Sequence, residues 1–153
     1  MVMNRKCFLS AMFFLFALSA MCQNMSSVGV ARLCEGDLLF CVKNKGNQIT
    51  DVTQGVGGMK IDHVAILHMT EGGTYALEAV HKGVSLTPID SFMASRDMVL
   101  AARLKDTVGV ARSVVRALRF LGKPYDFNFM PSDSAFYCSE LVQKCYRYKS
   151  GEL

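Results

Sequence analysis

The sequence of 153 residues lacks several patterns that would assign it to a common class of protein. It has no CxxC pair, so a structural zinc site has little support. Its histidines are His63, His68 and His81, and the five-residue spacing of the first two does not suit two ligands of one metal ion. The glycine-rich segment over 54–58 lacks a Gly-Lys-Ser/Thr ending, which argues against a phosphate loop. We therefore expect no metal and no cofactor.

The chain also lacks repeats, low-complexity tracts and a strong charge. Hydrophobic residues make up 51% and charged residues 20%, which is typical of a single globular domain. The formal net charge is +4 and falls to +2 if residues 1–22, which carry Arg5 and Lys6 and no acid, are removed. A charge this small gives no reason to expect a nucleic-acid partner.

Residues 1–22 predict a secretory signal. Arg5 and Lys6 precede an uncharged apolar run over 7–20, which is shorter than the ~20 residues that a membrane span needs. Cleavage after Cys22 would leave residues 23–34 as a polar leader. The segment is also compatible with a permanent membrane anchor or with a lipid attached to Cys22, so membrane association through the N-terminus stays open.

The remaining residues, 35–153, predict one α+β domain. Short apolar runs between turn residues predict strands over 36–43, 62–69, 74–80, 84–88 and 98–104. Helices are predicted over 89–95, over 107–121 with Asp106 as its cap, and over 134–148 with Ser132 or Asp133 near its start. The polar segment 44–60 is predicted to be a long loop. This pattern predicts a small antiparallel barrel or sheet packed by helices, including a last helix that carries Cys138.

The six cysteines do not predict local disulfides, although export would permit them. Cys34 and Cys41 flank or lie in one extended segment, and Cys138 and Cys145 lie about two helical turns apart. Neither pair would approach within the ~7 Å between Cα atoms that a disulfide allows. A bridge between the two segments stays open.

Cys138 is a candidate nucleophile. It falls within about the first turn of the last predicted helix, where unpaired N–H groups and the helix dipole lower a thiol's pKa. It shares a helical face with Leu141, Val142 and Cys145, so we expect it to point toward the sheet. A small buried core residue is the competing interpretation, since free cysteine is often that.

The strand register brings one histidine next to a carboxylate. The segment 70–73 (TEGG) predicts a hairpin between the second and third strands, in which Met69 faces Thr74. On this register Glu78 is the diagonal neighbour of His63 on one face, whereas His68 and His81 lie on the other. An odd loop or a bulge would separate the pair. Only His63 is then expected to gain a carboxylate that orients its ring, as a catalytic triad requires.

Five short motifs follow one another in an order that resembles a known family. They are Gly36-Asp37-Leu38-Leu39-Phe40, Asp62-His63-Val64-Ala65-Ile66, Glu78-Ala79 followed by Gly83-Val84, Pro124-Tyr125-Asp126, and Tyr137-Cys138-Ser139-Glu140-Leu141-Val142. Together they resemble the YaeF/YiiX-like permuted papain-like amidases, which are relatives of NlpC-type cysteine peptidases. The resemblance implies a circularly permuted papain-like fold, because the histidine precedes the cysteine along the chain.

The family resemblance also implies the roles of individual residues. It implies Cys138 as nucleophile, His63 as general base and Glu78 as the third polar residue, with the Cys138 backbone N–H as oxyanion donor. Tyr125, Asp126, Tyr137 and Ser139 match segments beside the pocket and are expected to bind substrate.

The implied activity is hydrolysis of an amide through an acyl-enzyme. With export, it points to a peptide of the cell envelope, such as a peptidoglycan stem peptide, in the periplasm or outer envelope. Two alternatives stay open: a lipid amide or ester hydrolase or acyltransferase, and a module on the same fold that binds an envelope peptide or lipid without turnover. The sequence does not set the oligomeric state.

Overall fold

The computed structural model describes residues 33–47, 49–50, 56–130 and 132–146. The predicted signal over 1–22 and nearly all of the predicted leader over 23–34 lie outside these residues. Every element below belongs to the part of the chain that begins at Cys34. Within the described ranges, no helix combines the length and the apolar character that crossing a bilayer requires.

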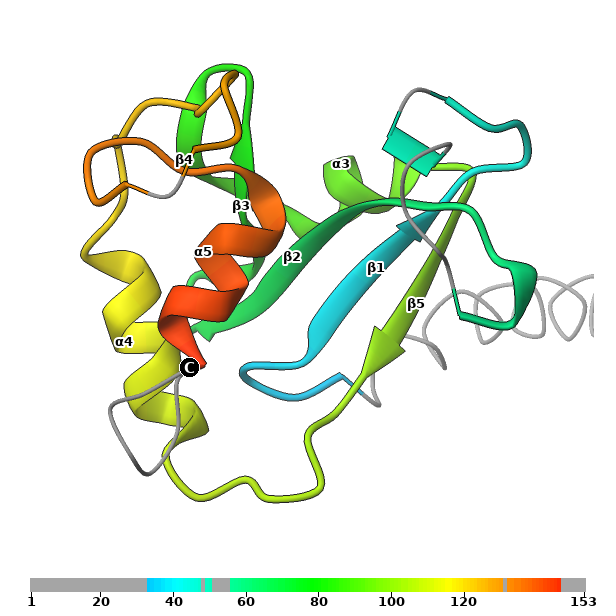
Figure 1. Ribbon diagram of the computed structural model, residues 1–153. Coiled ribbons are helices and arrows are strands. Elements are labelled where there is room, and N and C mark those ends of the chain that lie inside the picture. Colours follow the sequence, from blue (N-terminus) through cyan, green and yellow to red (C-terminus); the bar gives the residue numbers. More distant parts are fainter. Residues whose placement is uncertain (1–32, 48, 51–55, 131, 147–153) are drawn as a thin grey trace, which may run out of the picture. The chain divides into compact units, whose positions relative to one another are not determined.

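Five antiparallel strands form one open sheet, so the predicted α+β class is confirmed and the alternative of a closed barrel is wrong. The sheet order is β4-β3-β2-β1-β5 (Figure 1). The strands are β1 (Leu38–Val42), β2 (Ile61–Thr70), β3 (Gly73–Val80), β4 (Gly83–Pro88) and β5 (Met98–Ala102). Each lies within a few residues of its predicted range, because period-two apolar patterns between turn residues specify short strands well.

The hairpin between β2 and β3 has the predicted register. Met69 pairs with Thr74, and the ladder runs from Thr70 opposite Gly73 to Ile66 opposite Leu77. Before Ile66, β2 pairs with β1 alone, and after Leu77, β3 pairs with β4 alone, among the residues that the structure describes. The two strands therefore part at this point, which leaves room for side chains between them.

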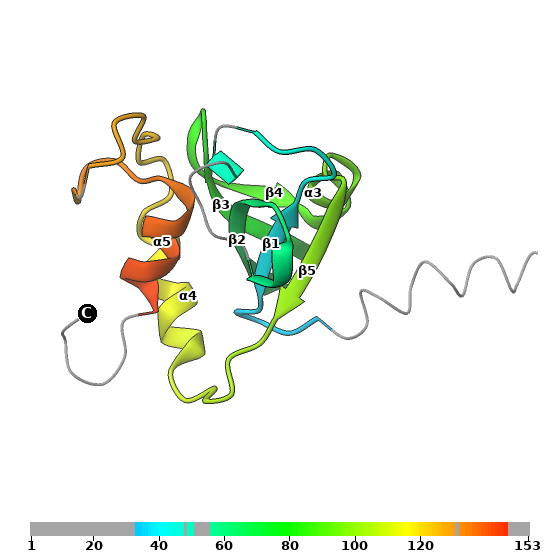
Figure 2. The ribbon, with the colours of Figure 1, turned by 45° about the vertical axis from the view of Figure 1, so that its right-hand side comes forward.

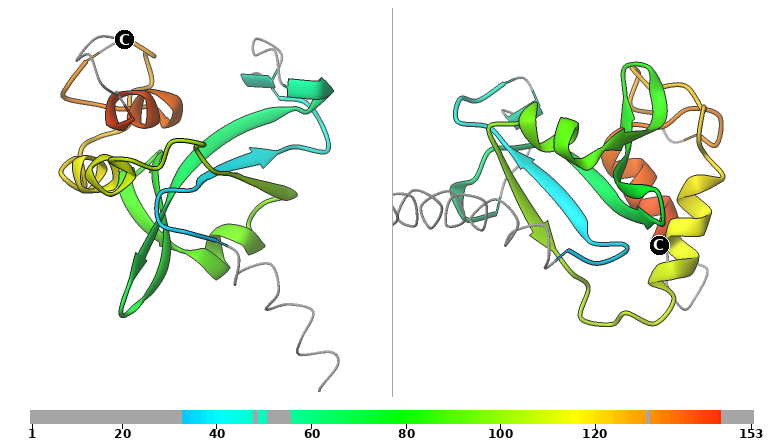
Figure 3. Two further views of the ribbon diagram at one scale, coloured as in Figure 1. Left: turned by 90° about the horizontal axis from the view of Figure 1, so that it is seen from below. Right: turned by 180° about the vertical axis from the view of Figure 1, so that it is seen from behind.

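Three helices and one short 3₁₀ turn, η1 (Val56–Gly58), complete the described elements. Helix α3 (Ile89–Ala94) contacts β3 and β4, and α5 (Cys138–Cys145) contacts β2 and β3. Helix α4 (Val110–Leu118) lies beside α5, as Figure 2 and the view from below in Figure 3 show. The main core lies between the sheet and these two helices, with Ile66, Leu77, Val114, Phe136 and Leu141 fully or almost fully buried.

Both long helices begin later in the chain than predicted. Helix α4 begins at Val110 after Gly109, whose φ of 88° needs the left-handed region, so Asp106 is not its cap. Asp106 instead accepts a hydrogen bond from the Val108 N–H in the preceding turn. Helix α5 begins at Cys138 rather than Ser134, because Phe136 is held in an extended pairing with Tyr125. The Phe136 N–H donates to the Pro124 carbonyl oxygen and the Phe136 carbonyl oxygen accepts from the Asp126 N–H, which prevents an earlier helical start.

Candidate active site

Cys138 is the first residue of α5. Tyr137 precedes it in an extended conformation, with φ −99° and ψ 168°. The first N–H groups of a helix have no acceptor within the helix, so they and the helix dipole favour negative charge at this position. The half-buried Cys138 thus stands closer to the helix N-terminus than the sequence predicted. At this position the Cys138 backbone N–H can donate a hydrogen bond to an oxyanion.

His63 and Glu78 lie together, as the hairpin register predicted. His63 Nε2 is 2.7 Å from Glu78 Oε2, and their side chains are 12% and 3% exposed. The His63 ring and the Cys138 thiol also interact: each shifts the pKa of the other toward its charged form through hydrogen bonding and charge. Since Nε2 is engaged by Glu78, Nδ1 is the ring nitrogen left for the sulfur. The three side chains therefore form one chain of contacts: thiol, imidazole, carboxylate.

Two further residues hold Glu78, and the sequence analysis missed both. Thr87 Oγ1 donates to Oε1 at 2.6 Å, and Arg96 Nη2 donates to Oε2 at 3.2 Å. The Arg96 guanidinium also lies over the Phe92 ring, 5.1 Å from its centroid. The facing strand register could have indicated Thr87, which lies two residues beyond Ser85, the residue opposite Glu78 in β4. No sequence pattern indicated Arg96, which follows α3 and reaches Glu78 only in the folded chain.

The electrostatics of the three residues favour a thiolate–imidazolium pair. Burial alone would raise the pKa of Cys138, but the hydrogen bond and charge of His63, with backbone N–H groups of Val64 and Ser139, hold it below its usual value. Burial would lower the pKa of His63, but hydrogen bonds to Cys138 and Glu78 raise it to about 9. Burial opposes the ionised form of Glu78, yet its bonds to His63 and Thr87 hold its pKa below the ordinary value.

The other described cysteines have different surroundings. Cys34, Cys41, Cys138 and Cys145 are all free thiols, so no bridge joins the two segments among them. Cys41 lies opposite His63 in the sheet register, and burial raises its pKa to about 12. Burial likewise raises the pKa of Cys145 to about 12. These two thiols stay protonated near neutral pH and fit the role of core residues.

The other two histidines have partners of their own. His68 also has a carboxylate partner, because its Nδ1 is 2.9 Å from Glu35 Oε1. The prediction that only His63 gains a carboxylate is therefore wrong. The sequence reasoning considered only Glu78 as a partner and did not foresee that the segment before β1 reaches β2. The exposed ring of His81 stacks on Phe127, with centroids 5.5 Å apart.

The residues expected to bind substrate surround Cys138 in the chain and in space. Tyr137 and Ser139 are its neighbours in sequence. Burial raises the pKa of Tyr125, with smaller contributions from the charges of Cys138 and Asp126, which places Tyr125 within electrostatic reach of the thiol. Asp126 is 6% exposed and accepts hydrogen bonds from the N–H groups of Asn128 and Met130. Its carboxylate therefore organises its own loop.

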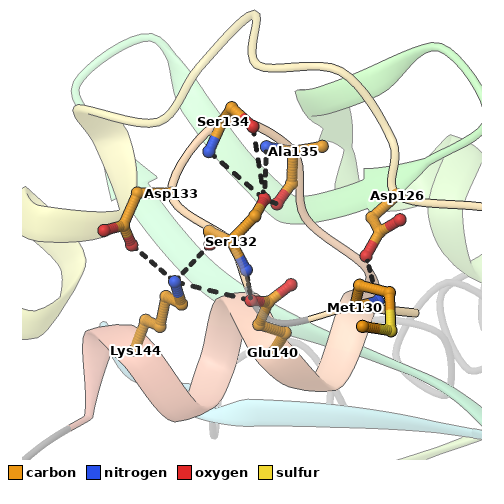
Figure 4. A network of polar contacts seen from close by, with 8 residues as sticks. All are labelled: Asp126, Met130, Ser132, Asp133, Ser134, Ala135, Glu140 and Lys144. Carbon is orange, nitrogen blue, oxygen red and sulfur yellow. Dashed lines mark hydrogen bonds and ion pairs between the residues drawn. The ribbon is translucent and has the colours of Figure 1, made fainter. Parts of the chain in front are cut away.

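A second polar network holds the segment that leads into the nucleophile (Figure 4). Lys144 of α5 donates to the Ser132 carbonyl oxygen and to Asp133, and lies 3.4 Å from Glu140. Glu140, 3% exposed, accepts from the Ser132 N–H at 3.2 Å. The helix thereby binds the loop that precedes it, which limits how far Cys138 can move from the sheet.

The first-strand turn lies beside a separate cavity. Gly36 and Asp37, which match the family's first motif, line a hollow of about 390 Å³ with Arg103 and Val110. Arg103 binds both carboxylate oxygens of the buried Asp37, at 2.7 and 2.8 Å, and this holds the Asp37 pKa below its usual range. None of the catalytic candidates lines this hollow, so we assign the pair a structural role.

A cysteine at a helix N-terminus, bonded to an imidazole that a buried carboxylate orients, defines the class of papain-like cysteine hydrolases on this α+β fold. The chain order His63, Glu78, Cys138 is that of a permuted form. The sequence profile described as "Permuted papain-like amidase enzyme, YaeF/YiiX, C92 family" matches residues 32–152. The protein belongs to this family of permuted papain-like amidases. Its membership supports hydrolase activity.

Two relatives place the chain within the family. The "Uncharacterized protein YiiX" of Escherichia coli strain K12 is 30% identical over 121 residues, covering 76% of this chain and 58% of YiiX. This chain thus spans less than two thirds of that relative. A solved structure, described as "Crystal structure of metalloprotein yiiX from Escherichia coli O157:H7, DUF1105", matches with a TM-score of 0.63 and 29% identity, over 77% of this chain and 67% of that one.

Proposed function

We propose that this protein hydrolyses an amide bond through an acyl-enzyme formed on Cys138. One observation carries the proposal: the Cys138 thiol, whose pKa is held below its usual value, is hydrogen-bonded to an imidazole that Glu78 orients. Burial raises the pKa of Cys41 and of Cys145 to about 12, so these two thiols provide the contrast within the same molecule.

The reaction would proceed in two halves. The Cys138 thiolate attacks the substrate carbonyl, and the oxyanion accepts a hydrogen bond from the Cys138 backbone N–H. The C–N bond then breaks as the His63 imidazolium gives its proton to the leaving amine. In the second half, His63 takes a proton from water, and the resulting hydroxide attacks the thioester carbonyl. The C–S bond then breaks, which releases the carboxylic acid and restores the Cys138 thiolate beside the His63 imidazolium. Glu78 stabilises the imidazolium in each half.

We infer a substrate of the cell envelope. The support is the predicted secretory signal over residues 1–22, which would direct the protein to the periplasm or outer envelope. A peptide amide such as that of a peptidoglycan stem peptide is the first candidate. The N-terminus, if uncleaved or lipidated at Cys22, would keep the protein at a membrane.

The related protein from Escherichia coli O157:H7 is described as a metalloprotein. The described residues of the present chain do not fit this description, because they contain no group of three or more His, Cys, Asp or Glu side chains able to hold a metal ion. His63 Nε2 is already bound to Glu78. We therefore derive no step through a metal.

The test uses turnover and thiol labelling together. Soluble stem-peptide fragments are incubated with the mature protein and the products identified by mass spectrometry, while iodoacetamide labelling of each cysteine is followed at pH 7. We expect Cys138→Ala to lower turnover by about 10³-fold or more, and Cys138 to label faster than Cys41 or Cys145.

Cys145→Ala is the matched control, since it removes a buried thiol from the same helix. It should retain turnover if the protein stays folded, which circular dichroism checks. Turnover that survives in Cys138→Ala would exclude the acyl-enzyme. A binding module would be favoured instead if the wild-type protein showed no turnover and bound an envelope peptide as tightly as Cys138→Ala does.

A further inference from the structure

The two edges of the sheet differ in how their backbone groups are used. At one edge, β4 is bonded to the chain that follows α4: the Val84 N–H donates to the Lys123 carbonyl oxygen, and the Val84 carbonyl oxygen accepts from the Gly122 N–H. At the other edge, β5 pairs with β1, and among the described residues no further backbone hydrogen bond reaches it. Figure 1 shows β5 as the last strand of the sheet. Its outer N–H and C=O groups are therefore offered to another chain.

Strand β5 also lacks the features by which natural edge strands prevent pairing. Its sequence over 98–102 (MVLAA) contains no charge, proline or glycine. The ladder between β1 and β5 runs without a shift in register, so no bulge turns this edge away. Met98, Ala101 and Ala102 are exposed. Because charges, proline and bulges are the usual protection of an edge strand, an edge without them favours pairing with a further strand.

The strand can pair with a second copy of itself. When two copies of one strand pair antiparallel about a twofold axis, one residue lies opposite its own copy, and residues at equal distances on either side of it face each other. With Leu100 on the axis, Met98 lies opposite Ala102 of the second copy. Apolar residues then meet along the whole strand.

The residues that flank β5 carry opposite charges, which this pairing brings together. Asp97 directly precedes the strand and Arg103 directly follows it, and both are exposed. On the same register, Asp97 lies opposite Arg103 of the second copy at each end of the paired strands. Exposed ion pairs contribute little affinity, but opposite charges at fixed positions select one register over others.

We propose that two copies of this protein associate by antiparallel pairing of their β5 strands, with Leu100 on the twofold axis. The two sheets then form one continuous sheet. Cys138, His63 and Glu78 lie in other elements, so this inference is independent of the proposed hydrolase function. Because β5 has only five residues, the contact is small, and we expect a dissociation constant on the order of 10 µM.

Sedimentation equilibrium tests the association. The average mass of the mature protein should rise from one chain toward two over about 1–100 µM. Met98→Lys, which places a charge on the edge at a side chain of 44% exposure, should weaken association about tenfold or more. Met69→Lys is the matched control, because Met69 is 45% exposed in β2, which is not an edge strand. It should leave association unchanged, and circular dichroism checks that both variants fold.

Cysteine cross-linking tests the register. Two Cα atoms directly opposite in an antiparallel pair lie about 4.5–5.5 Å apart, within the ~7 Å that a disulfide allows. Leu100→Cys should therefore form a disulfide with its own copy under mild oxidation, and mass spectrometry identifies the linked peptides. Ala101→Cys is the control, because its own copy lies two positions further along the strand, about 8 Å away. It should cross-link about tenfold more slowly or less.

Three results would overturn the proposal. A protein that stays monomeric up to about 200 µM does not associate through this edge, whether or not another segment occupies it. Association that Met98→Lys leaves unchanged uses a different surface. Faster cross-linking of Ala101→Cys than of Leu100→Cys places a different residue on the axis. Absence of turnover in a protein that still dimerises would contradict the hydrolase proposal alone.

Discussion

Arg96 donates from Nη2 to the same Oε2 atom of Glu78 that accepts from His63, at 3.2 Å and 2.7 Å respectively. The carboxylate is thus held by a permanent cation as well as by the imidazole. Arg96 follows α3 and Glu78 lies near the end of β3, so the packing of α3 on the sheet sets the geometry of the site. Arg96 is a positioning residue, since it acts through Glu78.

Arg96→Met should lower activity more at pH 5 than at pH 7. The charge of Arg96 helps to hold the Glu78 pKa below its ordinary value, so its loss raises that pKa and lets part of the carboxylate protonate in mild acid. We expect about a threefold loss of kcat/KM at pH 7 and about tenfold at pH 5. Arg96→Lys, which keeps the charge, should recover most of the difference. A loss that is the same at both pH values would contradict this role.

The pH profile of kcat/KM should be bell-shaped, with its alkaline limb near pH 9. Activity requires the Cys138 thiolate, which forms at a lower pH than usual, and the His63 imidazolium, which is lost as the pH rises through about 9. Glu78→Gln removes one cause of the raised His63 pKa, so the alkaline limb should move down by about one pH unit.

The second histidine–carboxylate pair provides the control for this shift. Glu35→Gln removes a carboxylate from His68 in the same way, and neither residue belongs to the Cys138, His63 and Glu78 group. Its profile should coincide with that of the wild-type protein. If Glu35→Gln moved the alkaline limb as far as Glu78→Gln does, the limb would report general electrostatics rather than the His63–Glu78 pair.

Asp126 should act by holding its own loop rather than by touching substrate. Asp126→Ala leaves the N–H groups of Asn128 and Met130 without the carboxylate and lets Phe129 leave its left-handed conformation. We expect the free energy of unfolding to fall by about 1–3 kcal/mol in a urea titration, while iodoacetamide labelling of Cys138 changes less than about threefold. Asp126→Asn, which still offers one carbonyl oxygen, should show an intermediate loss of stability. A large loss of turnover with unchanged stability would instead favour direct binding of substrate by Asp126.

Gly83→Ala should destabilise the fold. Gly83 has a φ of 100°, and a Cβ there would lie 2.4 Å from the Lys123 carbonyl oxygen, which accepts the Val84 N–H. That backbone oxygen cannot move without breaking the bond between β4 and the loop. We expect a loss of about 2–4 kcal/mol in the free energy of unfolding, measured by urea titration.

Gly72→Ala is the matched control for Gly83→Ala. A Cβ at Gly72 meets only the Thr70 hydroxyl, at 3.7 Å, which is an ordinary contact. The change should therefore cost less than about 0.5 kcal/mol. Equal effects of the two substitutions would show that the loop around Lys123 adjusts freely.

The sequence predicted the strands and the pairing of His63 with Glu78, because a hairpin signal and a period of two are local properties that the chain carries along its length. It predicted the start of α5 less well. The cap candidates Ser132 and Asp133 favoured an earlier start, but the pairing of Phe136 with Tyr125 is a tertiary interaction between segments that no local pattern reveals.

The amino-acid order by itself determined which side chains could carry the chemistry: one thiol near a helix start, one histidine in register with one acid, and the family that they indicate. The tertiary structure decided how these groups are held. It placed Cys138 at the first turn of α5, added Thr87 and Arg96 to Glu78, and turned Asp126 inward to hold its own loop. Such contacts join residues far apart in the chain, so only the packing of α3, α5 and the loop against the sheet could bring them together.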